Sequence, residues 1–130
     1  MADFYLKIKT NRMILKNLNN KNELEIEGNF STPRLLIGEF YDAISQLQSL
    51  LNQHGVMKGI ARLFGRKHRV LVHPLAQSEG GLCSVEERIL QEVVQGGFRG
   101  YTRKVMIHQS ERLFSDVEAK AELNKRISKN

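Results

Sequence analysis

The chain has 130 residues, of which 41% are hydrophobic and 26% charged; this composition indicates one ordinary folded domain and excludes a largely disordered chain. Twenty Lys and Arg against fourteen Asp and Glu give a net charge of +6, which permits an anionic partner without requiring one. A single cysteine, Cys83, excludes an internal disulfide, and no apolar run approaches the roughly 18 residues of a transmembrane helix. The N-terminus lacks the apolar core of a signal peptide, so we expect a cytoplasmic protein.

The positive charge is concentrated in one stretch of the sequence. Residues 43–78 contain no Asp or Glu, whereas the rest of the chain, with fifteen basic and fourteen acidic residues, is close to neutral. The cations of this stretch are Lys58, Arg62, Arg66, Lys67 and Arg69. We therefore predict that an electrostatic partner would meet residues 56–69, at one edge of the domain.

Three short strands are predicted within residues 1–28. Apolar Phe4, Leu6 and Ile8 alternate with polar residues, which is the period of a half-buried strand over 4–9. Extended patterns follow over 13–18 and over Glu23–Glu27, and turn-forming residues separate all three. Such strands, joined by tight turns, indicate an antiparallel meander.

The period then changes to that of helices. Residues 39–55 are predicted as a first helix, because apolar residues form one stripe and Gly55 suits a left-handed C-cap. Residues 56–69 form a basic connector to a buried strand at 70–72, which ends at His73-Pro74.

A second helix and a further strand and helix complete the chain. Ser84 and Glu87 fit a capping box at the start of the second helix, and Gly96-Gly97 suit its end. A strand is predicted over 104–108. A last helix is predicted over 110–127, with Leu113, Val117, Ala121 and Leu123 or Asn124 near its inner face.

The predicted order is β-β-β-α-β-α-β-α in one domain of residues 1–130, with a βαβα unit over 70–127. This order predicts an α/β fold: a three-strand antiparallel meander and two parallel βα units form a mixed sheet with helices packed on it. The ribonuclease H-like fold, shared by actin-like ATPases, has the same order.

Several segments resemble bacterial rod-shape-determining actin homologues of the MreB type. They are Arg-Val-Leu-Val-His-Pro at 69–74, Val-Glu-Glu-Arg at 85–88, Gln-Gly-Gly at 95–97 and Val-Met-Ile at 105–107. The likeness spans this whole chain but covers only the first lobe of that family. It implies a ribonuclease H-like, actin-like lobe that cannot close a two-lobed nucleotide cleft.

The resemblance also implies a degenerate nucleotide site. Where the family has the Asp and Gly of its first phosphate loop, this chain has Lys7 and Lys9, followed by Thr10. A lysine cannot organise a cation as a carboxylate does, and its side chain prevents the close approach that glycine allows. Glu86 alone matches a catalytic position of the family. We therefore expect no ATPase activity, no cofactor and no metal.

Other reactive side chains give no recognisable site by spacing. No metal-ligand spacing links Cys83 to a histidine or the histidines to one another, although His73 and His108 follow the two predicted parallel strands, where ligand crevices lie. Gly80-Gly81 precede a helix but lack the spacing of a phosphate-binding loop.

Function is expected to be non-enzymatic. We expect an actin-like single-lobe protein that acts through protein–protein contact or as a homo-oligomer, linked by the resemblance to cell shape or the cytoskeleton. The alternative is a small basic anion-binding module that contacts nucleic acid or an anionic membrane through residues 56–69. A residual ATP-binding protein is a further alternative, and no small-molecule substrate is predicted.

Overall fold

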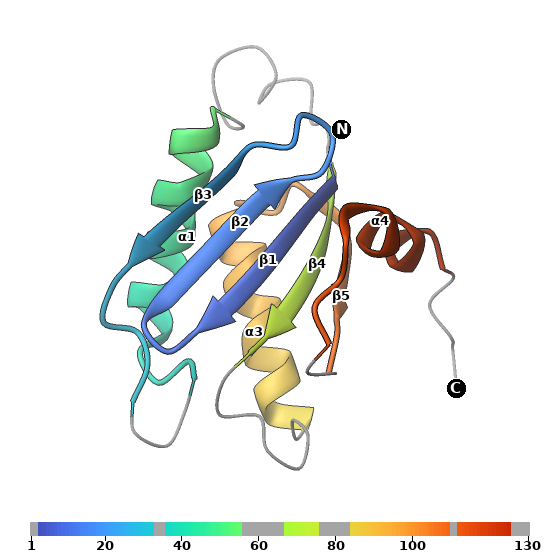
Figure 1. Ribbon diagram of the computed structural model, residues 1–130. Helices are drawn as coiled ribbons and strands as arrows, with labels where there is room; N and C mark the ends of the chain where they lie inside the picture. The colour runs from blue at the N-terminus through green and yellow to red at the C-terminus, as the bar shows by residue number, and fades with distance from the viewer. Residues whose placement is uncertain (1–2, 33–35, 56–66, 76–83, 110–111, 126–130) are drawn as a thin grey trace.

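Five strands form one open sheet in the computed structural model, which describes residues 3–32, 36–55, 67–75, 84–109 and 112–125 (Figure 1). The strands are β1 (Asp3–Lys9), β2 (Arg12–Asn17), β3 (Glu23–Glu27), β4 (His68–Pro74) and β5 (Thr102–Ile107). Their order in the sheet is β3-β2-β1-β4-β5. The meander β1–β3 is antiparallel, and β4 and β5 run parallel to β1, which confirms an α/β fold with a mixed sheet.

Asparagine side chains hold the turns of the meander. Asn11 adopts a left-handed φ of 54°, and its side chain accepts a hydrogen bond from the Ser31 N–H at 2.8 Å. Asn17 caps the second turn, since its Oδ1 accepts from the N–H of Asn19 at 2.9 Å. Asparagine suits both tasks because it tolerates positive φ and bonds nearby backbone.

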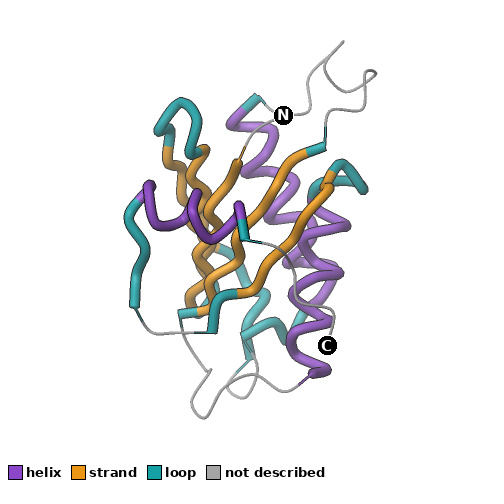
Figure 2. The backbone as a smooth tube through the Cα atoms, turned by 90° about the vertical axis from the view of Figure 1, so that its right-hand side faces the viewer, coloured by secondary structure: helices purple, strands orange, loops and turns teal. Residues whose placement is uncertain are grey.

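Helices cover the two sheet faces unequally. Helices α1 (Phe40–His54) and α3 (Ser84–Gly97) pack on one face, and α4 (Asp116–Asn124) is the one described helix on the other (Figure 2). We call these the two-helix face and the α4 face. As predicted, Gly55 ends α1 in the left-handed conformation, with φ 72°.

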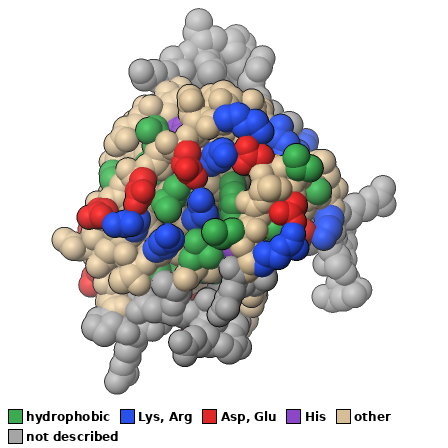
Figure 3. Space-filling view, viewed as in Figure 1, with side chains coloured by type: hydrophobic (Ala, Val, Ile, Leu, Met, Phe, Trp, Pro, Cys, Tyr) green, Lys and Arg blue, Asp and Glu red, His purple; other side chains and the backbone are tan. Residues whose placement is uncertain are grey.

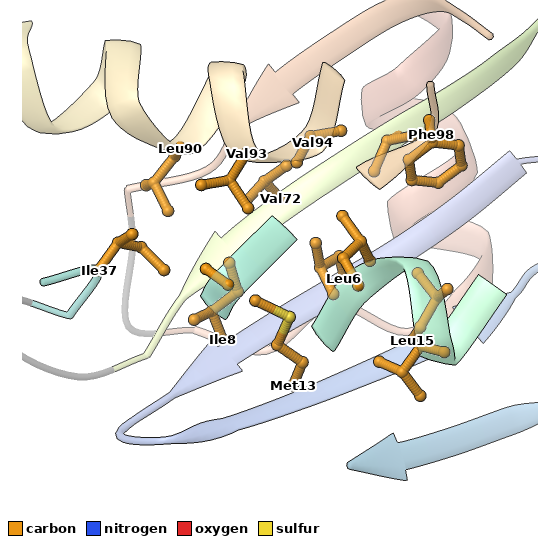
Figure 4. Packing of buried hydrophobic residues seen from close by; sticks show 14 of the residues in the cluster. Leu6, Ile8, Met13, Leu15, Ile37, Val72, Leu90, Val93, Val94 and Phe98 are labelled. Carbon is orange, nitrogen blue, oxygen red and sulfur yellow. The ribbon is translucent and has the colours of Figure 1, made fainter. Parts of the chain in front are cut away.

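The main core lies between the sheet and the two-helix face. Side chains from β1, β2 and β4 meet those of α1 and α3 there, and all of them are excluded from solvent (Figure 4). They include Leu6, Ile8, Met13, Leu15, Val72, Leu90, Val93, Val94 and Phe98. Burial of apolar area on this scale is the main stabilising contribution to a domain of this size.

The glycine pair at the end of α3 has a packing role. α3 ends at Gly97 as predicted, but the left-handed residues that follow are Arg99 and Gly100. A Cβ on Gly97 would lie 2.4 Å from Leu47 Cδ2 of α1. Gly97 therefore allows α1 and α3 to approach closely. The interpretation of the glycine pair as the C-cap of α3 was wrong.

The last helix differs most from its prediction. It begins at Asp116 instead of residue 110, with Ser115 as N-cap in a complete capping box with Glu118. Its buried side chains are Ala119 and Leu123. The predicted inner residues Leu113, Val117 and Ala121 are exposed, because residues 112–115 are not helical and the helix is rotated relative to the predicted one.

Two boundaries also change. β4 starts at His68 and includes His73 and Pro74, so residues 68–69 of the predicted connector belong to the sheet. Ser84 is already helical, so the predicted capping box at α3 was wrong about Ser84 as N-cap. Within the described residues, no helix is long and apolar enough to cross a membrane.

Candidate functional site

The predicted nucleotide positions lie at the end of β1. Lys7 is committed to an ion pair with Glu23 at 3.2 Å, and its Nζ lies 5.6 Å from the centre of the Tyr5 ring. Lys9 and Thr10 are exposed at the β1–β2 turn. Lys7, paired with Glu23, therefore occupies the position at which the resemblance requires an aspartate that organises a metal ion.

An open hollow of about 560 Å³ lies beside this turn. Its lining includes Lys9, Thr10, Arg12 and Leu75, so it adjoins the carboxyl ends of β1 and β4. Ligands of open α/β sheets commonly bind at such ends. Arg12, however, is neutralised here by Glu25 at 2.8 Å and Glu27 at 2.6 Å, and these carboxylates raise the pKa of its guanidinium.

Glu86 lies in the first turn of α3 and is half-buried. A carboxylate in the first turn of a helix interacts favourably with the helix dipole, by about 0.3–1 kcal/mol. Within the described residues, no group of three or more His, Cys, Asp or Glu side chains is arranged to hold a metal ion near Glu86 or elsewhere.

Arg69 of the predicted basic stretch forms a bidentate ion pair. Its Nε donates to Asp3 Oδ1 at 2.8 Å and its Nη2 to Asp3 Oδ2 at 2.7 Å, while Nη1 donates to Asn124 at 2.7 Å. The hydrogen bond from Arg69 lowers the pKa of Asp3, against the opposing effect of burial. Arg69 thus ties β4 to β1 and to the end of α4.

Of the other cations of the stretch, the structure describes Lys67. Lys67 is exposed just before β4. Lys58, Arg62 and Arg66, like Cys83 and Gly80-Gly81, lie outside the described residues. An anion contact through residues 56–69 therefore stays a prediction, and it rests on four cations, because Arg69 is engaged within the fold.

The structure brings together two histidines that the sequence placed at strand ends. The rings of His73 and His108 are 4.6 Å apart, and His108 stacks on Phe114 at 4.0 Å. The Tyr5 hydroxyl lies 2.6 Å from His73 Nδ1 and accepts from the Phe114 N–H at 3.2 Å. Burial raises the pKa of Tyr5.

This aromatic cluster positions the segment that leads into α4. Tyr5 and Phe114 were missed by sequence reasoning, and the alternation along β1 was the signal that placed Tyr5 opposite the main core. His54 and His68 contribute elsewhere: both pack edge-on against Phe4 in the main core. The cluster is polar and aromatic, which suits orientation of the segment more than tight hydrophobic packing.

The outer side of α4 carries an apolar stripe at spacing of four residues. Leu113 is 56% exposed and Val117 is 78% exposed, and Ala121 is also exposed. Val117 and Ala121, four residues apart, lie on one side of the helix, and Leu113 is exposed just before the helix begins. We call Leu113, Val117 and Ala121 the α4 stripe.

Beside α4, the rest of the α4 face is open and mixed in charge (Figure 3). Figure 3 shows Lys and Arg interleaved with Asp and Glu, and hydrophobic side chains between them. Asp116 at the start of α4 joins two lysines of the meander, Lys16 at 2.8 Å and Lys21 at 2.9 Å. The hydrogen bonds from the two lysines lower the pKa of Asp116, and the bond from Lys16 has the larger effect.

Comparison with known proteins gives one full-length relative. No family model and no solved structure matches the chain. The chain is 35% identical over 127 residues to the "Uncharacterized protein YjaA" of Escherichia coli strain K12, which covers 97% of this chain and 100% of that protein. The relative's name carries no activity, so no function passes from it. At this identity and coverage, the chain belongs to the YjaA family.

Proposed function

We propose that this protein is a non-enzymatic, actin-like (ribonuclease H-like) single lobe that acts through protein–protein contact, with self-association as one form. Two features support the lobe assignment: the element order β-β-β-α-β-α-β-α and a mixed sheet in which β1, β4 and β5 are parallel. The resemblance to rod-shape-determining actin homologues links the proposal to cell shape or the cytoskeleton.

The residues of β1 support a non-enzymatic function. Phosphoryl transfer depends on metal-bound and loop-bound phosphates for positioning and charge stabilisation. At the corresponding positions Lys7 is paired with Glu23, and Lys9 carries a side chain where a backbone approach is needed. Glu86 lies at the start of α3, and β1 carries lysines at the positions where the family has its Asp and Gly.

The single observation that carries the contact function is the α4 stripe. Val117 is a β-branched apolar side chain, 78% exposed, on a helix whose other side is already packed on the sheet. Isolated exposed apolar residues are common, but here Val117 and Ala121 lie on one side of a nine-residue helix and Leu113 is exposed just before it. A protein partner that covered the stripe would remove it from water.

The test places a photo-activatable side chain at Val117 and, as a matched control, at Val85. Val85 is 64% exposed and begins α3 at a different place on the surface. Cross-linking in cells of the source organism is expected to give a discrete adduct at position 117 and none of comparable yield at position 85.

Val117→Asp and Val85→Asp complete the design. Both changes are expected to leave stability within about 0.5 kcal/mol, since both side chains are exposed. Light scattering over a concentration series then tells self-association from a different partner. Equal cross-linking at both positions, or an adduct that persists unchanged with Ala121→Asp in the same chain, would contradict the proposal.

The structure changes the salt dependence that is expected for the anion-binding alternative. With Arg69 engaged by Asp3, at most four cations of residues 56–69 remain for phosphates. The salt dependence for duplex DNA would then have a slope of about −0.9 × 4 ≈ −3.6. Binding with that slope, lost in a variant that neutralises Lys67 and its neighbours, would favour this alternative over protein contact.

A further inference from the structure

The open edge of β3 and the adjoining side of α1 form a groove away from the α4 stripe. β3 is the last strand of the sheet on this side, and within the described residues it pairs only with β2. A hollow of about 340 Å³ lies between Ile26 and Asn29 on one side and a stripe of α1 on the other. That stripe consists of Asp42, Ser45, Gln46 and Ser49.

The backbone of β3 presents hydrogen-bonding groups to this groove. The Gly28 N–H bonds to the Asn11 carbonyl, on the β2 side, at 2.8 Å. Backbone groups alternate along a strand, so the N–H and C=O of Glu25 and Glu27 point away from β2. An edge of this kind is a template for one more strand.

The charge of the β3 edge is opposite to that of the whole chain. The carboxylates of Glu23, Glu25 and Glu27 line the α4 face of β3, and Asp42 lies in the wall formed by α1. Among the described residues, two cations pair with these glutamates, Lys7 with the first and Arg12 with the other two. An acidic edge therefore stands on a protein of net charge +6.

The floor of the groove holds an unsatisfied donor. Gln46 Nε2 is buried and has no hydrogen-bond partner within the described residues. The Gln46 amide lies against Gly28, where a Cβ would be 1.8 Å from its Oε1. A buried donor without a partner is costly, so an acceptor brought into the groove would be stabilised there.

We propose that this groove binds an extended peptide with Lys or Arg at alternate positions, which adds as a sixth strand to β3. The main chain of the peptide pairs with the outward groups of Glu25 and Glu27. Its basic side chains face the glutamates on the α4 face, and the intervening side chains enter the hollow beside Ile26. Strand addition of this kind takes affinity from main-chain bonds and selectivity from alternate side chains.

The probe is the fluorescein-labelled peptide Lys-Val-Lys-Val-Lys-Val-Lys, measured by fluorescence anisotropy with the full chain. Saturable binding that weakens with salt is expected. The same peptide with Glu for Lys is expected not to bind. A version with methylated backbone nitrogens is expected to bind at least about tenfold more weakly, since it lacks main-chain donors.

Two variants at one position separate charge from edge pairing. Glu25→Ala removes a carboxylate but keeps the outward N–H, whereas Glu25→Pro also removes that donor and spares the ladder to β2. Glu25→Pro is expected to bind at least about tenfold more weakly than Glu25→Ala. Circular dichroism checks that both fold, and if Glu25→Pro does not, the methylated peptide decides the question alone.

Several outcomes would overturn the inference. They are absence of saturable binding, equal binding of the methylated peptide, and equal affinity of the two folded Glu25 variants. The last two results would mean attraction between charges without strand addition. Val117→Asp is expected to leave peptide affinity unchanged, so failure of the groove and failure of the α4 stripe are distinguishable.

Discussion

The two faces of the sheet differ in how they are covered and in what side chains they carry. On the two-helix face, apolar side chains of β1, β2 and β4 meet two long helices, and the whole cluster is buried. On the α4 face, a nine-residue helix covers a small cluster around Tyr5 and Leu71, and charged residues occupy the remainder.

This difference indicates that the two-helix face mainly stabilises the fold, whereas the α4 face offers surfaces for contact with partners. The two-helix face contributes most of the buried apolar area, so its side chains mainly stabilise the fold. On the α4 face, charged side chains form ion pairs with one another, and apolar side chains on the outer side of α4 are exposed to solvent. One proposed contact uses the outer side of α4, and the other uses the β3 edge, between the glutamates of the α4 face and the hollow beside α1.

The strongest test of the comparison removes one leucine from each face. Leu6 and Leu71 are both fully buried, Leu6 in the main core and Leu71 under α4. Leu6→Ala is expected to lower the free energy of unfolding by about 3–5 kcal/mol, because the cavity lies among well-braced helices. Leu71→Ala is expected to cost about 2–3 kcal/mol, because the short helix can settle onto the gap.

Urea unfolding followed by circular dichroism measures both values. Equal losses would show that α4 is as firmly held as the helix pair, and the division between the faces would not hold. A larger loss for Leu71→Ala would reverse it.

The sequence predicted the two-helix face far better than the α4 face. The alternating apolar residues of β1 are buried and α1 formed as predicted, but Asp3 and Tyr5 on the other side of β1 are buried too, so β1 is not half-buried. α4 buries only Ala119 and Leu123, so its weak pattern allowed a helix rotated away from the true one. The capping box at Ser115 was the local signal that would have placed its start correctly.

The contacts of the site residues were also beyond what the sequence could predict. A bidentate bond between Arg69 and Asp3 joins residues 66 positions apart, and charge counting along the chain treated Arg69 as a free cation. The meeting of His73 with Tyr5 likewise depends on the register of β1 and β4, in which Lys7 lies beside His73. Spacing along the sequence carries no information about partners on neighbouring strands.

The next largest effect concerns the pair that closes the α4 face. Asp3→Ala is expected to cost about 2–3 kcal/mol, because it leaves the guanidinium of Arg69, 13% exposed, without its carboxylate. The pKa of Asp3 is lowered in the folded state, chiefly by the Arg69 hydrogen bond. Its contribution is therefore complete above the unfolded value near 3.8 and is lost as the pH falls through the lower folded value.

Thermal unfolding between pH 7 and pH 2 measures this dependence. Asp3→Asn is the matched control, because it keeps the shape and removes the titration. The difference between wild type and Asp3→Asn is expected to shrink as the medium becomes more acidic through this window. A difference that stayed constant would show that the carboxylate's charge is not what stabilises the pair.

A smaller loss is expected at the contact between the two helices. Gly97→Ala adds a Cβ that would lie 2.4 Å from Leu47 Cδ2 and 2.9 Å from its Cβ, so the helices must separate slightly. We expect about 1–3 kcal/mol of destabilisation. At Gly96 the nearest atom is the flexible tip of Ile44, at 2.9 Å, so Gly96→Ala should cost less in the same urea experiment. The reverse order would mean that α1 and α3 pack differently.

The smallest effect belongs to Asp116, which joins α4 to the meander through Lys16 and Lys21. These are surface ion pairs, so Asp116→Asn is expected to cost less than about 1 kcal/mol, including lost interaction with the helix dipole. Because salt screens exposed charges, most of this cost should vanish in concentrated sodium chloride, whereas the cost of Asp3→Ala should largely remain. Urea unfolding of both variants at low and high salt measures this contrast. An equal salt response would mean that Asp3 and Arg69 are as solvated as the surface pairs. The α4 face would then be held by packing on Tyr5 and Leu71 alone.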